Sequence, residues 1–94
     1  MKSFPFPDLI LRLPQADIPI EGLRAYIAQG DHFQMVFMSF EQDTDVPAHS
    51  HAEQWEIVLE GMADVTIDNK TVRYRKGDRM HLQAGVVHSA FVHA

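Results

Sequence analysis

The chain has 94 residues, of which 46% are hydrophobic, and a formal net charge of −5. This length suits one small domain, and the hydrophobic fraction is too high for a disordered chain. The chain has no cysteine, so disulfides and thiolate metal sites are excluded. The acidic balance argues against a nucleic-acid partner, which selects a basic protein face.

No apolar run approaches the roughly 20 residues that a membrane-spanning helix needs. Prolines and Asp8 interrupt the first residues, so no continuous apolar signal segment is present there. We therefore expect a cytoplasmic protein without a membrane partner.

The first elements in chain order are dominated by proline. Residues 1–21 contain four prolines, Pro5, Pro7, Pro14 and Pro19. Because proline disfavours helix interiors and suits edge positions, we expect an extended N-terminal arm with short strand pieces. Residues 22–94 are then expected to form a single domain.

Short β-rich runs follow the arm, separated by turn residues. The predicted strands cover residues 23–28, 34–40, 46–51, 55–59, 63–67, 71–74, 79–82 and 87–93. Asp68 and Asn69 lie between two of these runs and form a good two-residue hairpin turn, since Asn tolerates positive φ. The pattern predicts an all-β sandwich or barrel with no substantial helix.

Two histidines, His49 and His51, are the first sign of chemistry. On a strand, residues i and i+2 project from one face about 7 Å apart, so two imidazoles can converge on one ion. A pair of this kind is also common as surface decoration, so it needs support from the rest of the chain.

That support comes first from residues 43–61, which resemble the first motif of the cupin superfamily, G-x5-H-x-H-x3–4-E-x6-G. His49, His51 and Gly61 match the motif. Gln54 occupies the glutamate position with a gap one residue shorter than usual, and Asp43 replaces the opening glycine.

Residues 77–92 resemble the second cupin motif, G-x5-P-x-G-x2-H-x3-N. Gly77, Gly85 and His88 match at the right spacings, while Gln83 replaces the proline and Val92 the asparagine. The chain is similar to small single-domain cupins across about half of its length.

The resemblance implies a small β-barrel of the double-stranded jelly-roll type that holds one divalent transition metal. The implied ligands are His49, His51, Gln54 and His88, with water or substrate completing the coordination. Ligand type alone does not choose among Mn, Fe, Ni, Cu and Zn.

The fourth ligand is open at this point. Gln54 is a neutral donor, so the site keeps a higher positive charge than a glutamate site and favours anionic substrates. Glu56 shares the Gln54 face of a strand and is either the alternative ligand or a catalytic acid/base. Glu53 is a third candidate, although it falls in the expected turn.

Strand alternation makes a second prediction. Simple alternation buries Trp55, Ile57 and Leu59, whereas the cupin motif points Gln54 inward together with Glu56. Both hold only if the outer face is covered by the N-terminal arm or by another subunit. We therefore expect a homodimer with the three apolar residues near its interface.

The leading functional hypothesis is a metal-dependent enzyme, first oxygenase-like and second isomerase- or lyase-like, acting on a small oxygen-rich or anionic metabolite. The alternative is a module that binds or senses a metal or small molecule without turnover. Fold alone does not separate these, because barrels of this type carry many activities.

Overall fold

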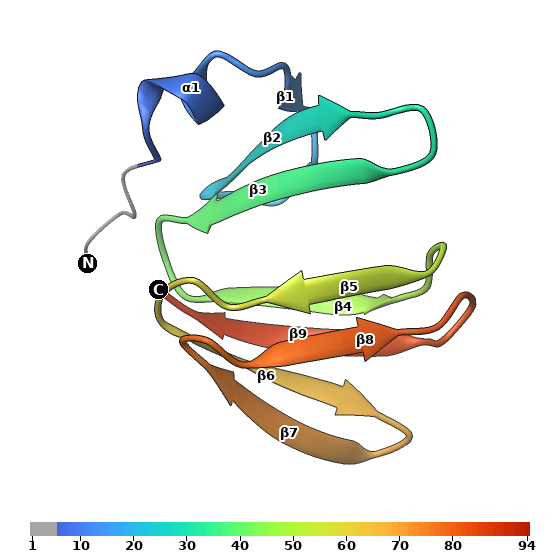
Figure 1. Cartoon of the computed structure of the whole chain (residues 1–94). Coiled ribbons are helices and arrows are strands. Elements are labelled where there is room, and N and C mark those ends of the chain that lie inside the picture. Colours follow the sequence, from blue (N-terminus) through green and yellow to red (C-terminus); the bar gives the residue numbers. More distant parts are fainter. Residues whose placement is uncertain (1–5) are drawn as a thin grey trace. The chain divides into compact units, whose positions relative to one another are not determined.

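Antiparallel strands form nearly all of the regular structure in residues 6–94, the part of the chain that the computed structural model describes (Figure 1). The all-β prediction is confirmed. The chain divides into two units, Met1–Gln42 and Asp43–Ala94, each with its own sheets. The predicted boundary at residue 22 stays a prediction. No helix in residues 6–94 is long and apolar enough to cross a membrane.

The first unit is a three-stranded sheet with one helical turn. Its elements are α1 (Asp8–Leu11), β1 (Gln15–Ala16), β2 (Leu23–Gln29) and β3 (Gln34–Phe40), and the strand order is β1-β2-β3. Phe6 packs edge-on against Tyr26 and Phe37, with ring centroids 6.1 and 5.9 Å apart. This aromatic cluster, together with buried Ala25, forms the core of the unit.

The helical turn corrects one expectation from the sequence. The arm was predicted to be extended, but Asp8–Leu11 is helical and begins directly after Pro7, the N-cap residue. Proline disrupts a helix interior but is tolerated at its start, where its missing N–H has no helical partner to lose. The prolines of the arm therefore exclude long helices but permit this short one.

The second unit contains two antiparallel sheets. Four strands form the larger sheet in the order β4-β9-β6-β7, and two strands form the smaller sheet β5-β8. The strands of this unit are β4 (Thr44–His49), β5 (Gln54–Ile57), β6 (Met62–Ile67), β7 (Lys70–Arg75), β8 (Arg79–Leu82) and β9 (His88–His93). Each overlaps a predicted run.

The larger sheet buries one face over β4, β9 and β6. Thr44, Val65 and His88 are buried, and Val65 pairs with both Ala90 and Val72, so these residues share one face. We call this the inner face of the sheet. The β4–β9 register shifts between Val46 and His49, and this irregularity lies next to the histidine pair.

Two turns carry residues in the left-handed region. Asp68 and Asn69 have φ values of 51° and 65° and close the β6–β7 hairpin, which confirms the predicted two-residue turn. Gly61, which precedes β6, has φ of 76°, and a Cβ there would lie 3.0 Å from the carbonyl oxygen of His93. Both the backbone angle and the space therefore favour glycine at Gly61.

Candidate metal centre

The structure brings three histidines from the two motifs together. His49 ends β4, His51 follows it, and His88 begins β9. Their ring centroids are 5.3 Å apart for His49 and His51, 4.3 Å for His49 and His88, and 4.8 Å for His51 and His88. One ligand atom from each ring lies within 4.8 Å of the others, and this is the cluster of metal-ligating side chains found in residues 6–94.

Backbone pairing explains why residues so distant in the sequence meet. His49 and His88 are direct partners in the antiparallel β4–β9 ladder. The N–H of Gly85 donates to the carbonyl of His51 at 3.0 Å, which ties the turn before His88 to the histidine pair. Gly85 has φ of 82°, a backbone conformation that side chains other than glycine rarely adopt.

Each ring also has its orientation set by a backbone carbonyl. The Nδ1 atoms of His49, His51 and His88 lie 2.8, 2.8 and 3.0 Å from carbonyl oxygens. The acceptors are the carbonyls of Pro47, Ala52 and Val86 respectively. A carbonyl only accepts, so each Nδ1 carries the proton and each neutral ring keeps its lone pair on Nε2.

This arrangement fits a divalent transition metal. Two nitrogens bound at about 2.1 Å to one ion are at most about 4.2 Å apart, so the 4.8 Å cluster needs only small ring rotations to close on an ion. Metal-bound histidines commonly donate their second N–H to a carbonyl, as all three do here. The three histidines are therefore positioned for metal binding, and nitrogen ligands of this kind suit several transition metals.

The two residues expected beside the histidines lie on β5. Gln54 and Glu56 are both half-buried and pair with Leu82 and Met80 of β8. Leu82 is 2% exposed, so these four residues share the buried face of the small sheet. Gln54 stays a predicted ligand beside the cluster of His49, His51 and His88.

Glu56 is electrostatically coupled to the cluster. Burial raises the pKa of the Glu56 carboxyl above its ordinary value, and the positive charge that His88, His51 and His49 carry in their protonated form partly opposes this rise. Glu56 is therefore close enough to the three histidines for their charge to influence it. A half-buried carboxyl near three metal-ligating side chains is typical of a functional site.

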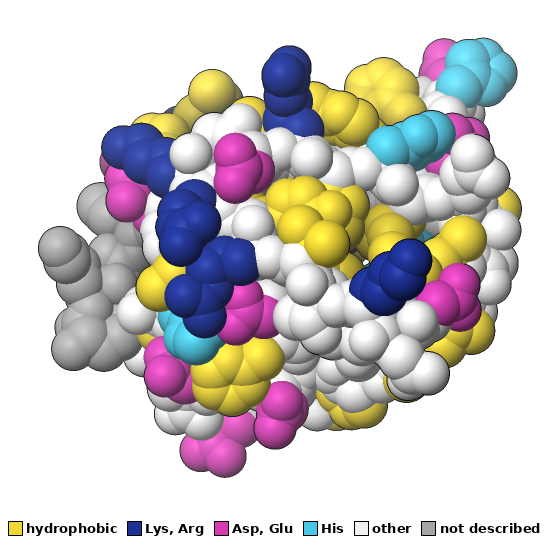
Figure 2. All heavy atoms as spheres, turned by 90° about the horizontal axis from the view of Figure 1, so that it is seen from below, with side chains coloured by type: hydrophobic (Ala, Val, Ile, Leu, Met, Phe, Trp, Pro, Cys, Tyr) yellow, Lys and Arg dark blue, Asp and Glu magenta, His cyan; other side chains and the backbone are white. Residues whose placement is uncertain are grey.

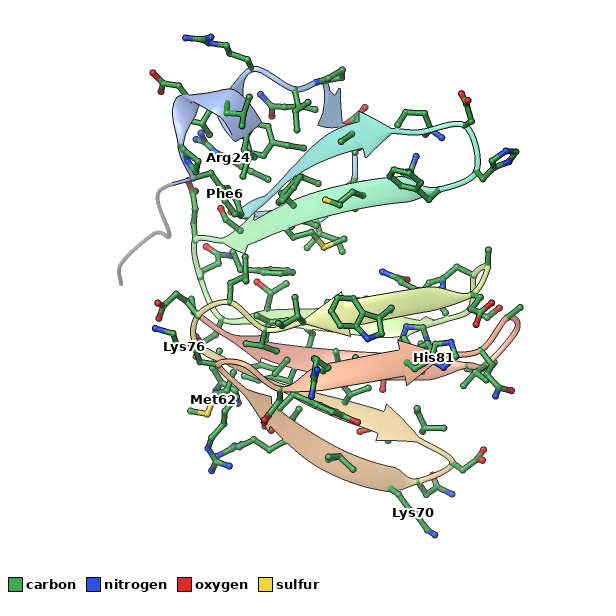
Figure 3. The ribbon with its side chains drawn as sticks, viewed as in Figure 1. Phe6, Arg24, Met62, Lys70, Lys76 and His81 are labelled. Carbon is green, nitrogen blue, oxygen red and sulfur yellow. The ribbon has the colours of Figure 1, made fainter. Side chains whose placement is uncertain are left out.

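The remaining histidines lie elsewhere, as the motif predicts. His81, labelled in Figure 3, projects from β8 and forms an exposed pair with Glu53 at 2.5 Å. This pairing occupies Glu53, the third candidate for the fourth ligand. His93 contacts Asp64 at 2.9 Å, and Asp64 also accepts two hydrogen bonds from Arg73. No motif in the sequence predicts this Asp64 cluster.

Comparison with known proteins agrees with the geometry. The family model described as Cupin domain matches residues 36–93. The structure of KdgF from Halomonas sp. superposes with a TM-score of 0.73 and 20% identity, covering 85% of this chain and 74% of that one. An RmlC-like cupin from Shewanella frigidimarina superposes with a TM-score of 0.74 and 25% identity, covering 95% and 78%.

No curated protein matches the chain. The structural likenesses confirm the predicted fold class, a small β-barrel of the jelly-roll type. The family match spans more than half of the residues and includes all three clustered histidines. The chain belongs to the cupin family.

Proposed function

We propose that this protein is a metal-dependent cupin enzyme that acts on a small oxygen-rich or anionic metabolite. The observation that carries the proposal is the common orientation of the three histidines. Each Nδ1 lies against a backbone carbonyl, which leaves three Nε2 lone pairs for one ion. The carbonyl contacts hold the rings before any metal arrives, so less conformational entropy is lost on binding.

Gln54 is proposed as the fourth ligand. It follows His51 by three residues and lies on the buried face of β5. Its amide oxygen is a neutral donor, so this ligand set adds no negative charge to the ion. A bound Mn, Fe, Ni, Cu or Zn ion would act as a Lewis acid toward substrate oxygens, and a redox-active ion would also support oxygen chemistry. The neutral ligand set favours an anionic substrate.

Glu56 is proposed as the proton carrier. Its carboxyl is half-buried and coupled to all three histidines, and burial raises its pKa. A raised pKa brings a carboxyl closer to neutral pH, where it both holds and releases a proton at Oε. Oxygenase-like chemistry is the first candidate and isomerase- or lyase-like chemistry the second. Isomerase- and lyase-like reactions move a proton at the substrate, and an oxygenase uses the same group where its substrate must first be deprotonated.

Metal analysis of protein purified without added metal tests the proposal. We expect close to one transition-metal ion per chain, retained in a His32→Ala variant and lost in a His88→Ala variant that stays folded. His32 is exposed and lies outside the histidine cluster, so it is a matched control. Protein that binds no divalent ion, or His88→Ala protein that keeps it, would contradict the proposal.

Turnover separates an enzyme from a binding module. Oxygen uptake by the metal-loaded protein with diketones, thiols and phenols identifies an oxygenase. Proton exchange into the same compounds, followed by NMR, identifies isomerase- or lyase-like chemistry. A Glu56→Gln variant that keeps the metal should lose about 10²- to 10⁴-fold in rate. Full activity in this variant would remove Glu56 from the mechanism, and tight binding without turnover would favour the non-catalytic module.

A further inference from the structure

A second feature lies on the inner face of the larger sheet, over β6 and β7. It is a hollow of about 280 Å³, close to the lower limit of small-molecule sites. Four apolar or aromatic side chains and two charged ones line it: Val65, Ile67, Val72, Tyr74, Asp68 and Lys70. The hollow belongs entirely to the second unit. It holds none of the clustered histidines.

Strand register places this hollow beside the histidine row. Ser89 pairs with Thr66, so one step further along both strands Ile67 lies beside His88. Ile67 in turn pairs with Lys70. His49, His88, Ile67 and Lys70 therefore form one row across four neighbouring strands. With neighbouring strands about 4.8 Å apart, the backbone of Lys70 lies about 10 Å from that of His88.

The lining has an apolar floor and a charged rim. Val65 is 4% exposed and forms the floor, while Val72 is 51% exposed because β7 is the edge strand. Hydrophobic side chains gather near the centre of the face seen from below, with a basic side chain beside them (Figure 2). Such a surface accepts an aliphatic chain and excludes water from it.

Lys70 supplies the positive charge at the rim. It extends from the hairpin end of β7 (Figure 3) and forms no ion pair with any residue in the described part of the chain. Arg73 of the same strand is paired with Asp64, and Lys76, just past the other end of β7, is paired with Glu60. Asp68 is the one opposing charge in the lining. A mobile ammonium over an apolar floor selects an anion at the end of an apolar chain.

We propose that this hollow binds an aliphatic carboxylate, the tail of a substrate whose oxygen-rich head reaches the metal centre. The inference deepens the proposed function and rests on it for the head of the molecule. The tail pocket itself depends on the six residues that line the hollow and on none of the histidines. The substrate class is therefore a chelating acid whose second carboxylate is at about the sixth carbon of the chain, a length that suits the row of about 10 Å.

The first test uses metal-free protein and two simple probes, hexanoate and 1-hexanol. They share an apolar chain and differ in charge. We expect both to shift the methyl NMR signals of Ile67 and Val72, with hexanoate binding about two- to five-fold more tightly, the gain typical of an exposed charge pair. Equal affinities, or shifts elsewhere only, would overturn the inference whatever the metal content.

Three variants test whether the charge of Lys70 causes the preference for hexanoate. Lys70→Gln should abolish the preference for hexanoate and leave hexanol binding unchanged. Asp68→Asn should strengthen hexanoate binding, since it removes the opposing charge and Asn tolerates the positive φ at this position. Lys76→Gln is the matched control, because Lys76 is exposed, pairs with Glu60 and does not line the hollow. A similar loss in Lys76→Gln would reduce the effect to net charge and overturn the inference.

The second test links the hollow to the metal. 2-Oxohexanoate and 2-oxoadipate share a chelating head, and only the second has a terminal carboxylate. Calorimetry with metal-loaded protein should show 2-oxoadipate bound more tightly, and Lys70→Gln should bring the two affinities together. If the chain binds no metal while the hexanoate preference persists, the proposed function fails and the tail pocket stands. If the metal binds but the two acids are not distinguished, the inference fails alone.

Discussion

His49 and His88 face each other as direct partners across β4 and β9, with ring centroids 4.3 Å apart. Two of the three metal-ligating side chains are therefore placed by one antiparallel ladder. The third, His51, is tied to the same region by the hydrogen bond from the Gly85 N–H. The centre is preorganised by backbone pairing, which holds ligands more precisely than a mobile loop does.

This preorganisation predicts strong thermal stabilisation by metal. A ligand that binds only the folded state at 100 times its Kd adds about 2.7 kcal/mol. For a chain of this length, about 1 kcal/mol corresponds to a rise of roughly 4–8 °C in Tm. Added Ni(II) or Zn(II) should raise the Tm of the wild type and of His32→Ala, and leave that of His88→Ala unchanged. Equal rises in all three would place the ion elsewhere.

Replacing Glu56 with glutamine should stabilise the folded protein while slowing the proposed reaction. Burial disfavours its charged form and raises its pKa, so the folded state holds the proton more tightly than the unfolded chain. By linkage, its contribution to stability therefore falls as pH rises through the interval between the two pKa values. Glu56→Gln removes this penalty, and metal-free protein at pH 8 should gain on the order of 1 kcal/mol in free energy of unfolding.

The control for this change is Glu53→Gln. Glu53 is exposed and pairs only with exposed His81, so its replacement should change stability by less than about 0.5 kcal/mol. Denaturant unfolding of the two variants at pH 8 measures the difference. A loss of stability in Glu56→Gln would mean that the charged carboxylate is better satisfied than its burial indicates.

The backbone geometry of Gly61 and Gly77 predicts that replacing each with alanine destabilises the protein to a different degree. Gly61 and Gly77 both have positive φ, 76° and 88°, so alanine is strained at either, by about 1 kcal/mol. At Gly61 the new Cβ also meets the His93 carbonyl at 3.0 Å, whereas nothing lies within 4 Å at Gly77. Gly61→Ala should therefore be the more destabilised variant in thermal melts. Equal Tm losses would show that the His93 strand end moves away freely.

Much of this architecture is predictable because it depends on local patterns. Each strand of the second unit overlaps a predicted run, and the Asp68-Asn69 hairpin has the expected positive φ values. The helical turn at Asp8–Leu11 was missed, since four residues are too few to show a helical period. The proline content of residues 1–21 indicated only that a long helix is absent there, and it did not predict the short one.

The candidate site likewise has features that local sequence patterns predict and features that they do not. The spacing of His49, His51 and His88 carried the prediction that they meet, and the structure brings them together. The carbonyls that orient their Nδ1 atoms belong to the backbone. Because every residue has a backbone carbonyl, the sequence does not indicate which ones contact the rings. Lys70 was also missed, because its place in the histidine row depends on pairing across four strands rather than on any motif.

The apolar row on β5 predicts self-association. Trp55 and Ile57 are 60% and 43% exposed, on the side of the strand opposite Gln54 and Glu56, and Leu59, just past the strand, is 46% exposed. The homodimer expected from the sequence would cover these side chains. Sedimentation at micromolar concentration should show a dimer, and Trp55→Lys should shift it toward monomer without loss of bound metal. A monomeric wild type would contradict the prediction.

The Asp64 cluster predicts acid sensitivity. Hydrogen bonds from Arg73 and His93 hold the pKa of Asp64 well below its ordinary value. The folded state therefore favours the carboxylate, and its contribution to stability is complete above the unfolded pKa of about 3.9 and is lost as pH falls below it. Asp64→Asn should have a lower Tm than the wild type at pH 7, and the gap should narrow as pH falls from 5 to 2. Asp45→Asn, on the same sheet face and exposed, should match the wild type at each pH. A gap that stays constant with pH would mean that Asp64 acts through packing and not through its charge.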